Sequence, residues 1–274
     1  MSRINNVTFR RIVDIVYKES GIVLENKQEL VEARLISLCR KQGYESPEAF
    51  LKLLKKDRTG SLLVELLNQV STNVTHFFRE KAHFDFVIRT LMPKLEVKKK
   101  TEGSNRVRFW SAACSSGEEP YSLAMAIHHY RAGNAEWDLK ILATDISTQA
   151  LQKARQGLYS RQEVKKTPPH LYKRYFSLID NHDDPVYKIS DEIKQMIAFR
   201  RLNLLKEDYP FSGLFDLIMC RNVMIYFDTQ TKEALMKRFR KYLHPGGILI
   251  IGHTESLTGY EKYFKRVGIG IYEK

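Results

Sequence analysis

The sequence is poor in cysteine and has no long apolar run. A membrane-spanning helix needs roughly 18 apolar residues in succession, and no stretch of this chain approaches that length. The N-terminal residues MSRINNVTFRRIV also lack the apolar core of a signal peptide. Three cysteines, odd in number and far apart, indicate neither a disulfide framework nor a metal site built from paired cysteines. We therefore expect a soluble, cytoplasmic protein with reduced thiols, no bound metal and no membrane insertion.

Acidic residues are outnumbered by basic residues, 32 to 45, which gives a formal net charge of +13. Such a charge attracts acidic partners, and nucleic acid, an anionic membrane face and an acidic protein surface all qualify. A soluble protein with a merely basic surface fits the same charge equally well. The composition therefore leaves the partner open, although 43% hydrophobic residues are too many for a disordered chain.

Residues 1–90 carry the pattern of a small helical domain. Apolar residues recur three and four positions apart in four segments, and glycines or a Ser-Pro pair stand at the segment ends. The segments are FRRIVDIVYKESG, NKQELVEARLISLCRKQG, SPEAFLKLLKKD and SLLVELLNQV. Residues 91–106 are expected to form a linker or exposed loop, because EVKKKTEGSNR is polar and has no periodicity.

Strand and helix patterns alternate over residues 107–274, which predicts an α/β domain with a doubly wound, mostly parallel sheet. The expected strands lie near 107–113, 139–145, 197–202, 214–220, 246–252 and 267–273, and the expected helices near 120–132, 147–156 and 229–243. Two short β-like runs flank the turn-rich NHDDP and interrupt this alternation. We therefore expect a small antiparallel β insertion at about 174–200.

The loop SSGEEPYS, residues 115–122, contains a single glycine although it lies between a strand pattern and a helix pattern. Loops that hold a nucleotide phosphate in this place are usually rich in glycine, because phosphate needs close contact with backbone N–H groups. This loop has Glu118 and Glu119 instead. A positively charged ligand with adenosine and no phosphate suits it, and S-adenosylmethionine meets these conditions. Both acids would also stand at the N-terminus of the expected helix, where negative charges interact favourably with the helix dipole, and this explains the pair equally well.

The second strand pattern, LKILATD, ends on Asp145. Ligands of doubly wound sheets lie at the carboxyl ends of the strands, where a carboxylate can accept hydrogen bonds from both hydroxyls of a ribose. The alternative is that Asp145 only caps the helix that follows. We favour the ribose contact, because Ser147 or Thr148 can serve as the cap.

Several segments, in this order, closely resemble the CheR-type chemotaxis receptor methyltransferases. They are TNVTHFFRE (72–80), SAACSSGEEPYSLA (111–124), ATDIS (143–147), NLL (203–205) and FDLIMCRNVMIYF (215–227). The resemblance also covers the N-terminal helices and the closing LHPGGILIIGHTES. It implies a Rossmann-like methyltransferase fold. It further implies transfer of a methyl group from S-adenosylmethionine to glutamates on the cytoplasmic helices of chemoreceptors, with S-adenosylhomocysteine as product and no nucleic-acid partner.

The same resemblance implies roles for individual residues. The implied cofactor-binding residues are Asn73, Thr75, Arg79, Glu119, Asp145, Asn203, Leu204, Arg221 and Asn222. Arg79 and Arg221 are expected to position the attacking carboxylate. Tyr226 lies in the same motif and is expected to face the methyl group, although an aromatic residue at such a place is as often part of the core. Glu119 rather than Glu118 is the implied ligand contact. No general base is expected, because a glutamate with a pKa near 4.3 is already ionised at neutral pH.

Lys27, Arg34 and Lys41 lie seven residues apart and form a basic stripe on the helix expected within 26–43. A solvated helix face is the ordinary explanation of such a stripe. The resemblance implies instead that these residues meet the acidic helix of the receptor.

A nucleic-acid methyltransferase is the main alternative function, since the net positive charge suits contacts with phosphates. Many such enzymes hold a flipped base with an Asn-Pro-Pro-Tyr or Asp-Pro-Pro-Tyr motif. The corresponding strand end here reads CRNVMIYF and has no proline. A non-catalytic protein that binds S-adenosylmethionine as a signal is a further alternative.

Overall fold

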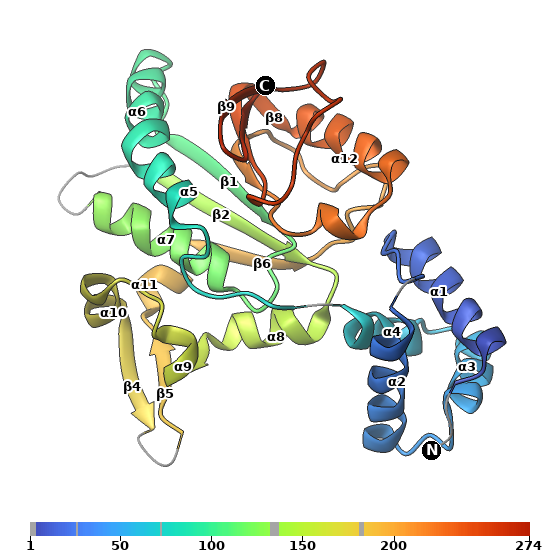
Figure 1. Ribbon diagram of the computed structural model, residues 1–274. Helices are drawn as coiled ribbons and strands as arrows, with labels where there is room; N and C mark the ends of the chain where they lie inside the picture. Colours follow the sequence, from blue (N-terminus) through green and yellow to red (C-terminus); the bar gives the residue numbers. More distant parts are fainter. Residues whose placement is uncertain (1–3, 26, 72, 132–136, 181–183) are drawn as a thin grey trace.

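The helical and α/β regions predicted from the sequence are both present in the computed structural model. The structure describes residues 4–274 except 26, 72, 132–136 and 181–183. Four helices form one domain, and a sheet flanked by helices forms the other, from which a second, smaller sheet projects (Figure 1). Within the described residues, no helix combines the length and the apolar character that a membrane span requires.

The N-terminal domain consists of α1 (Asn6–Ser20), α2 (Gln28–Gln42), α3 (Pro47–Lys56) and α4 (Ser61–Val70), close to the predicted segments. Asn5 and Ser46 accept backbone N–H bonds at the starts of α1 and α3, and Gly21 ends α1 in the left-handed conformation. The apolar faces of the helices meet in one core, which includes Ile12, Val16, Leu35, Phe50 and Leu66. The three-and-four spacing of apolar residues was therefore a reliable signal here.

The main sheet has seven strands in the order β6-β2-β1-β7-β8-β10-β9. Its parallel strands are β1 (Arg106–Ala112), β2 (Asp138–Asp145), β6 (Ile197–Arg201), β7 (Phe215–Met219) and β8 (Leu243–Ile250). The last two strands, β9 (Lys265–Gly268) and β10 (Ile271–Glu273), are antiparallel. The chain moves outward from β1 through β2 to β6 and then returns to the other side of β1 with β7. This reversal next to β1 is where doubly wound sheets bind their ligands.

Both faces of the sheet are buried, which confirms the doubly wound prediction. Neighbouring residues on β1 show it: Phe109 packs into one apolar core and Trp110 into the other, and both side chains are fully buried. The helices α7 (Glu118–Tyr130) and α8 (Thr148–Gln156) contribute to the first core, and α12 (Thr229–Tyr242) contributes to the second.

The predicted linker at 91–106 is wrong for most of its length. Residues 81–101 form a helical run composed of α5 (Lys81–Phe86), the π-helical turn η1 (Val87–Leu91) and α6 (Met92–Thr101). Met92 and Leu95 are buried against the sheet, and Lys99 is buried in an ion pair with Asp216, with Nζ and Oδ1 3.2 Å apart. The many lysines of this segment concealed its buried face. Residues 77–95 therefore pack with the sheet, whereas the core of the helical domain ends at Val70.

The antiparallel insertion is present but begins earlier and ends sooner than 174–200. Its strands are β3 (Leu158–Ser160), β5 (Val186–Ile189) and β4 (Phe176–Asp180), paired in that order, and its short helices are α9 (Arg161–Val164), α10 (Pro169–Tyr175) and α11 (Asp191–Lys194). The run at 197–201 belongs instead to the main sheet as β6. The predicted turn NHDDP lies partly outside the described residues, because 181–183 are not among them.

Arg34 connects two helices of the N-terminal domain. Its Nη1 atom donates to the carbonyl oxygens of Gln69, Val70 and Ser71, at 3.1, 2.8 and 2.9 Å. The last carbonyls of a helix have no partner within the helix, so the guanidinium satisfies the end of α4 and is also attracted to its negative dipole end. Arg34 therefore has a structural role in this domain.

We predict that Arg34→Met lowers the stability of the helical domain, whereas Lys41→Met, at an exposed position of the same helix, does not. Loss of charged hydrogen bonds to three carbonyls costs about 1.5 to 3 kcal/mol. Urea unfolding followed by circular dichroism measures the difference. Equal midpoints for the two variants would show that the cap contributes nothing.

Candidate functional site

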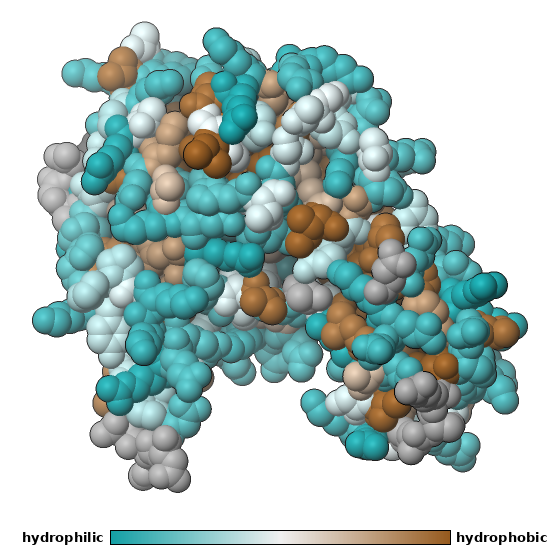
Figure 2. All heavy atoms as spheres, in the orientation of Figure 1, coloured by the Kyte–Doolittle hydropathy of each residue, from teal (hydrophilic) through white to brown (hydrophobic). Residues whose placement is uncertain are grey.

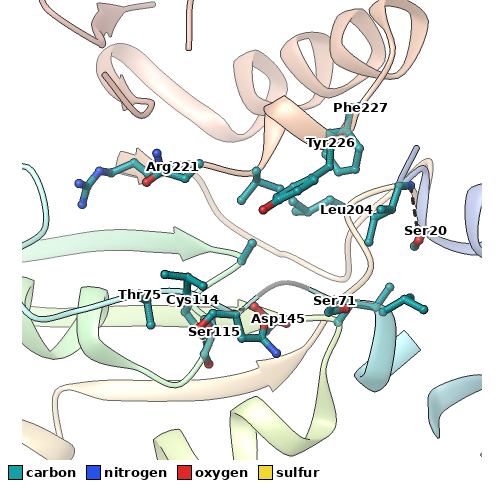
Figure 3. Close-up of a pocket in the computed structure, with 18 of the residues that line it drawn as sticks. Ser20, Ser71, Thr75, Cys114, Ser115, Asp145, Leu204, Arg221, Tyr226 and Phe227 are labelled. Atoms are coloured by element: carbon teal, nitrogen blue, oxygen red, sulfur yellow. Dashed lines mark hydrogen bonds between the residues drawn. The ribbon is translucent and has the colours of Figure 1, made fainter. Parts of the chain in front are cut away.

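A pocket of about 1070 Å³, part of it open to solvent, lies at the carboxyl ends of β1, β2 and β7, where the strand order reverses. The helical domain forms part of its wall through Ser20, Ile22, Leu24, Lys27 and Val70. Figure 3 shows Tyr226 and Leu204 on one side of the pocket and Ser115 and Asp145 on the other. Its place, at the reversal of strand order, is where doubly wound sheets bind their ligands.

The structure brings the predicted cofactor residues together around this pocket. Its lining includes Asn73, Thr75, Arg79, Glu119, Asp145, Asn203, Leu204, Arg221 and Asn222, together with Lys27 and Tyr226. They come from segments that lie far apart in sequence. Those from Glu119 onward lie at or just after strand ends, which the parallel sheet brings together, whereas Asn73, Thr75 and Arg79 lie between α4 and α5.

The loop between β1 and α7 has an unusual backbone. Ala113 and Ser115 have φ angles of 60° and 50°, and Gly117, just before α7, has φ 99°. A Cβ at Gly117 would lie 2.9 Å from Cβ of Ala154 and 3.0 Å from the Tyr159 hydroxyl, so a side chain does not fit there. Left-handed backbone at residues other than glycine costs about 1 to 3 kcal/mol and is concentrated at functional sites. The single glycine of the loop is therefore required by packing and by conformation.

Asp145 does not cap the helix that follows it. Its Oδ2 accepts the backbone N–H of Ser115 at 2.7 Å and its Oδ1 that of Ser147 at 2.8 Å, while the Ser147 hydroxyl caps α8 by accepting from Ala150 N at 3.1 Å. These bonds aim the carboxylate at the pocket that it lines. Burial raises the pKa of Asp145, and the N–H bonds oppose that rise. The helix-cap explanation is thus removed, and each oxygen keeps a lone pair for a ligand.

Glu119 and Glu118 have different surroundings. Glu119 lines the pocket, and its oxygens accept from the Ser111 hydroxyl at 2.7 Å and from Arg221 Nη1 at 3.2 Å. Glu118 is buried and accepts from the Ser116 hydroxyl at 2.7 Å. Burial raises the pKa of both carboxyls, and for Glu119 the positive charge of Arg221 works against that rise. Only Glu119 of this pair is therefore available to a ligand in the pocket.

Arg221 is not free to grip a substrate. Its side chain is 2% exposed, and it lies between two carboxylates, Glu119 at 3.2 Å and Glu80 at 3.0 Å. Its Nη2 also donates to the carbonyl oxygen of Arg79. The guanidinium carbon lies 5.5 Å from the centre of the Phe84 ring. The predicted direct hold of Arg221 on the attacking carboxylate is therefore not supported, because its charge is already paired inside the protein.

Arg79 is placed differently from Arg221. It is half-buried in the pocket wall, and its Nη1 donates to the carbonyl oxygen of Val74 at 2.9 Å. No carboxylate within the described residues forms an ion pair with it among those found at 4 Å or less. Its neighbours Phe78 and Glu80 have φ angles of 53° and 55°, so the backbone at this position is unusually bent. Arg79 is consequently suited to an anion that enters from outside.

Three side chains beside the pocket, Glu80, His83 and His253, have potential metal-ligand atoms within 4.8 Å of one another. His83 is fully buried, its Nε2 lies 3.1 Å from the carbonyl oxygen of Ile269, and its Nδ1 has no hydrogen-bond partner. The same carboxylate oxygen of Glu80 that faces His83 also accepts from Arg221 and from the backbone N–H of His253. A cation placed there would meet the guanidinium, so this cluster does not favour a metal ion.

The helical domain is attached to the sheet domain at the pocket itself. Asn203 donates to the carbonyl oxygen of Glu19 at 2.6 Å, and Val23 N donates to the carbonyl oxygen of Tyr226 at 2.9 Å. Nζ of Lys27 lies over the Tyr226 ring, 4.5 Å from its centre. On the face shown in Figure 2, apolar residues gather along the junction of the two domains. The pocket is thus formed by both domains and not by the sheet alone.

The predicted basic stripe is divided in the structure. Lys27 precedes α2 and lines the pocket, Arg34 is bound to the end of α4, and Lys41 is exposed in the last turn of α2. The seven-residue spacing predicted a shared face but could not show that one member is held by backbone carbonyls. The predicted contact of this stripe with the receptor helix stays a prediction, in which Arg34 also has a structural role.

Several residues of the site were missed by sequence reasoning. Glu80 follows Arg79 directly in a recognised motif, and Glu255 lies in the closing HTES segment, yet neither was assigned a role. Glu255 accepts backbone N–H bonds from Asn222, Met224 and Gly252, at 2.7 to 2.8 Å, and so joins the ends of β7 and β8. Only the fold reveals these partners, because Arg221 lies 141 positions from Glu80, and Asn222 and Met224 lie 33 and 31 positions from Glu255.

Comparison with known proteins agrees with this geometry. Residues 73–272 match the family model described as CheR methyltransferase, SAM binding domain, and residues 8–71 match the model described as CheR methyltransferase, all-alpha domain. The chain belongs to the CheR methyltransferase family. The boundary between the two models, at residues 71–73, coincides with the end of the helical core at Val70. As a CheR methyltransferase, the protein uses S-adenosylmethionine as its methyl donor.

Relatives match nearly the full length of this CheR protein. A chemotaxis protein methyltransferase of Borreliella burgdorferi is 41% identical over 251 residues, which covers 91% of this chain and 88% of the relative. The chemotaxis protein methyltransferase of Escherichia coli K12 is 36% identical over 270 residues, covering 98% and 90%. Both domains of the chain therefore have counterparts in these relatives.

His83 provides a pH test of this region. Burial, together with the charge of Arg221, lowers its pKa to about 4. The unfolded chain takes up a proton near the ordinary value of about 6.5, so stability is retained above that pH and falls as the pH drops from about 6.5 to 4. A pKa difference of this size between the folded and unfolded states corresponds to about 3 kcal/mol in the free energy of unfolding.

We expect His83→Gln to lose less stability than the wild type between pH 7 and pH 4, by up to about that 3 kcal/mol. Urea unfolding at several pH values measures the free energy of unfolding of both proteins. The contributions of the other histidines cancel in the difference, because both proteins contain them. Parallel curves for the two proteins would show that His83 titrates normally in the fold.

Proposed function

We propose that this protein methylates glutamate side chains on the cytoplasmic helices of chemoreceptors, in the cytoplasm, and that the product is a glutamyl methyl ester. The observation that supports it is the position of the pocket between two domains that both match chemotaxis methyltransferases. Relatives similar to the chain over nearly its whole length are named chemotaxis protein methyltransferases. The exposed mouth of the pocket would admit a side chain from a large partner.

The pocket residues suit S-adenosylmethionine. Asp145, with both oxygens oriented by N–H bonds, would accept the ribose hydroxyls, and Glu119 would accept the ammonium group of the amino-acid tail. Asn203 and Leu204 would flank the adenine, while Asn73, Thr75 and Asn222 complete the wall. Two buried acids and no phosphate cradle agree with a cationic ligand without phosphate.

Methyl transfer to a glutamate needs few catalytic groups from the protein. Bound S-adenosylmethionine supplies a methyl group on a sulfonium, and the acceptor oxygen forms a bond to that carbon while the carbon–sulfur bond breaks. The acceptor glutamate is ionised at neutral pH, so no proton has to be removed. Alignment is then the main contribution, and orientation of this kind supplies about 7 to 11 kcal/mol. A site shielded from water further promotes a step in which opposite charges are neutralised.

Arg79 is the residue that we assign to positioning the acceptor carboxylate. It lines the pocket, and its neighbouring residues leave its charge unpaired, whereas Arg221 is held by Glu80 and Glu119. Moderately strong binding is useful, because very tight binding would stabilise the carboxylate in the ground state more than in the transition state. Tyr226, whose ring stands in the pocket wall with its hydroxyl toward the interior (Figure 3), would pack against the transferred methyl group.

The docking of the receptor helix is assigned to the pocket mouth and to the nearby face of α2. Lys27 lines the pocket just before α2 and Lys41 lies exposed in the last turn of α2, and both would attract an acidic helix. Val74, 75% exposed, and Ile225, 54% exposed beside Tyr226, add apolar area at the same place. Arg34 is assigned to the structure of α4 and not to direct docking.

The proposal is tested by methyl transfer from labelled S-adenosylmethionine to receptor cytoplasmic fragments, with RNA and DNA as parallel acceptors. The expected product is labelled receptor that loses its label as methanol in mild base, as a carboxyl ester does. Replacement of the acceptor glutamates by alanine should abolish the label. Label in nucleic acid, or label on the receptor that resists base, would contradict a glutamyl ester.

A second prediction concerns the assigned ribose contact. Asp145→Asn should weaken cofactor binding by about tenfold or more, because a charged hydrogen bond contributes about 1.5 to 3 kcal/mol. Asp138→Asn, at the opposite end of β2, is the matched control and should bind normally. Titration calorimetry with S-adenosylhomocysteine measures both. Unchanged affinity in a folded Asp145 variant would remove this residue from the binding site.

A further inference from the structure

The carboxylate of Glu80 joins three segments of the site. Its Oε2 accepts from Arg221 Nη2 at 3.0 Å and from the backbone N–H of His253 at 3.2 Å, and its Oε1 accepts from Asn222 Nδ2 at 3.4 Å. Arg221 and Asn222 follow β7, and His253 follows β8. Glu80 itself precedes α5, so one side chain connects the Arg79 segment to the ends of two neighbouring strands.

The backbone around Glu80 is held in a costly shape. Glu80 has φ 55° and Phe78 has φ 53°, both in the left-handed region that side chains rarely adopt. The carbonyl oxygen of Arg79, between them, accepts from Arg221. Conformations of this kind persist only where the surroundings determine them, and here the surroundings are the bonds of Glu80 and Arg221.

The charges of this cluster are not balanced. Arg221 carries one positive charge and lies between two carboxylates, Glu80 and Glu119, whose side chains are 14% and 12% exposed. Burial disfavours ionisation of Glu80, but the charge and hydrogen bonds of Arg221 outweigh it and hold the pKa of Glu80 below its ordinary value. With both acids ionised, the cluster has a net charge of −1 and is suited to one additional positive group.

We infer that Glu80 is a positioning residue for the cofactor tail: it holds Arg221 by its second nitrogen, so that the cluster of Glu80, Arg221 and Glu119 keeps a net negative charge for the ligand's ammonium group. The inference rests on the proposed role of Glu119. Without the carboxylate of Glu80, Arg221 has Glu119 as its remaining ion-pair partner within the described residues. The pair would then neutralise itself, and its attraction for an ammonium group would fall.

Two ligands separate this role from a general loss of structure. S-Adenosylhomocysteine has the amino-acid tail, whereas 5′-methylthioadenosine has the same nucleoside and thioether without it. The difference between their affinities measures what the tail contributes. The nucleoside side of the pocket depends on other bonds, such as those of Asp145 to Ser115 and of Asn203 to Glu19.

The test compares the wild type with Glu80→Gln by calorimetry. The variant keeps the shape of the side chain and loses its charge, so we expect the affinity ratio of the two ligands to fall about tenfold, with methylthioadenosine binding within about twofold of the wild type. Glu80→Asp, which keeps the charge, should restore part of the ratio. Asp85→Asn is the matched control, since Asp85 is an exposed acid on α5 that pairs with Lys81.

Equal weakening of both ligands, or an unchanged ratio in Glu80→Gln, would overturn the inference and leave Glu80 with a structural role only. A wild-type protein that binds neither ligand would instead count against the proposed cofactor site. Melting temperatures of all variants accompany the titrations, so a fold defect is recognised directly. Should Glu80→Gln not fold, Glu80→Asp replaces it. Its shorter side chain should lower the ratio of the affinities for S-adenosylhomocysteine and methylthioadenosine, and an unchanged ratio would again overturn the inference.

Discussion

The buried guanidinium of Arg221 is the interaction on which the site depends. Two carboxylates and a backbone carbonyl surround it, and they come from the Arg79 segment and from α7. Removing three charged groups from water is expensive, and such a cluster is stable only when its hydrogen bonds are well formed. The cluster therefore contributes less to the stability of the fold than to the precise placement of the loops. The cluster holds the loops in one arrangement because other arrangements leave a buried charge unpaired.

The second constraint is the position of the helical domain. Bonds between the domains, such as Asn203 to Glu19 and Val23 to Tyr226, lie in the wall of the pocket, and the apolar side chain of Ile22 packs against the cores of both domains. A movement of the helical domain would open the part of the pocket wall that contains Asn203 and Tyr226. A ligand that contacts both domains should therefore stabilise their contact.

The fold was largely predictable because its signals are periodic. Apolar spacing located the helices, and strand patterns in alternation with helices predicted the parallel sheet. The helix at 92–101 was missed because its buried face is small, with Met92 and Leu95 among many lysines. For the site, strand-end position and family resemblance predicted Asp145 and Glu119 as cofactor residues, and both line the pocket. Neither could show that Arg221 is already paired, since its partner Glu80 lies 141 positions away in sequence.

The contact of Arg34 with the end of α4 affects how mutational data should be interpreted. The carbonyls that it holds belong to residues 69–71, and two of these, Val70 and Ser71, line the pocket. A charge reversal at this arginine would disturb the pocket wall as well as the surface charge of α2. An assay that varies only the receptor concentration would attribute the whole defect to docking. Titrating the donor and the acceptor separately distinguishes a displaced wall from a lost recognition contact.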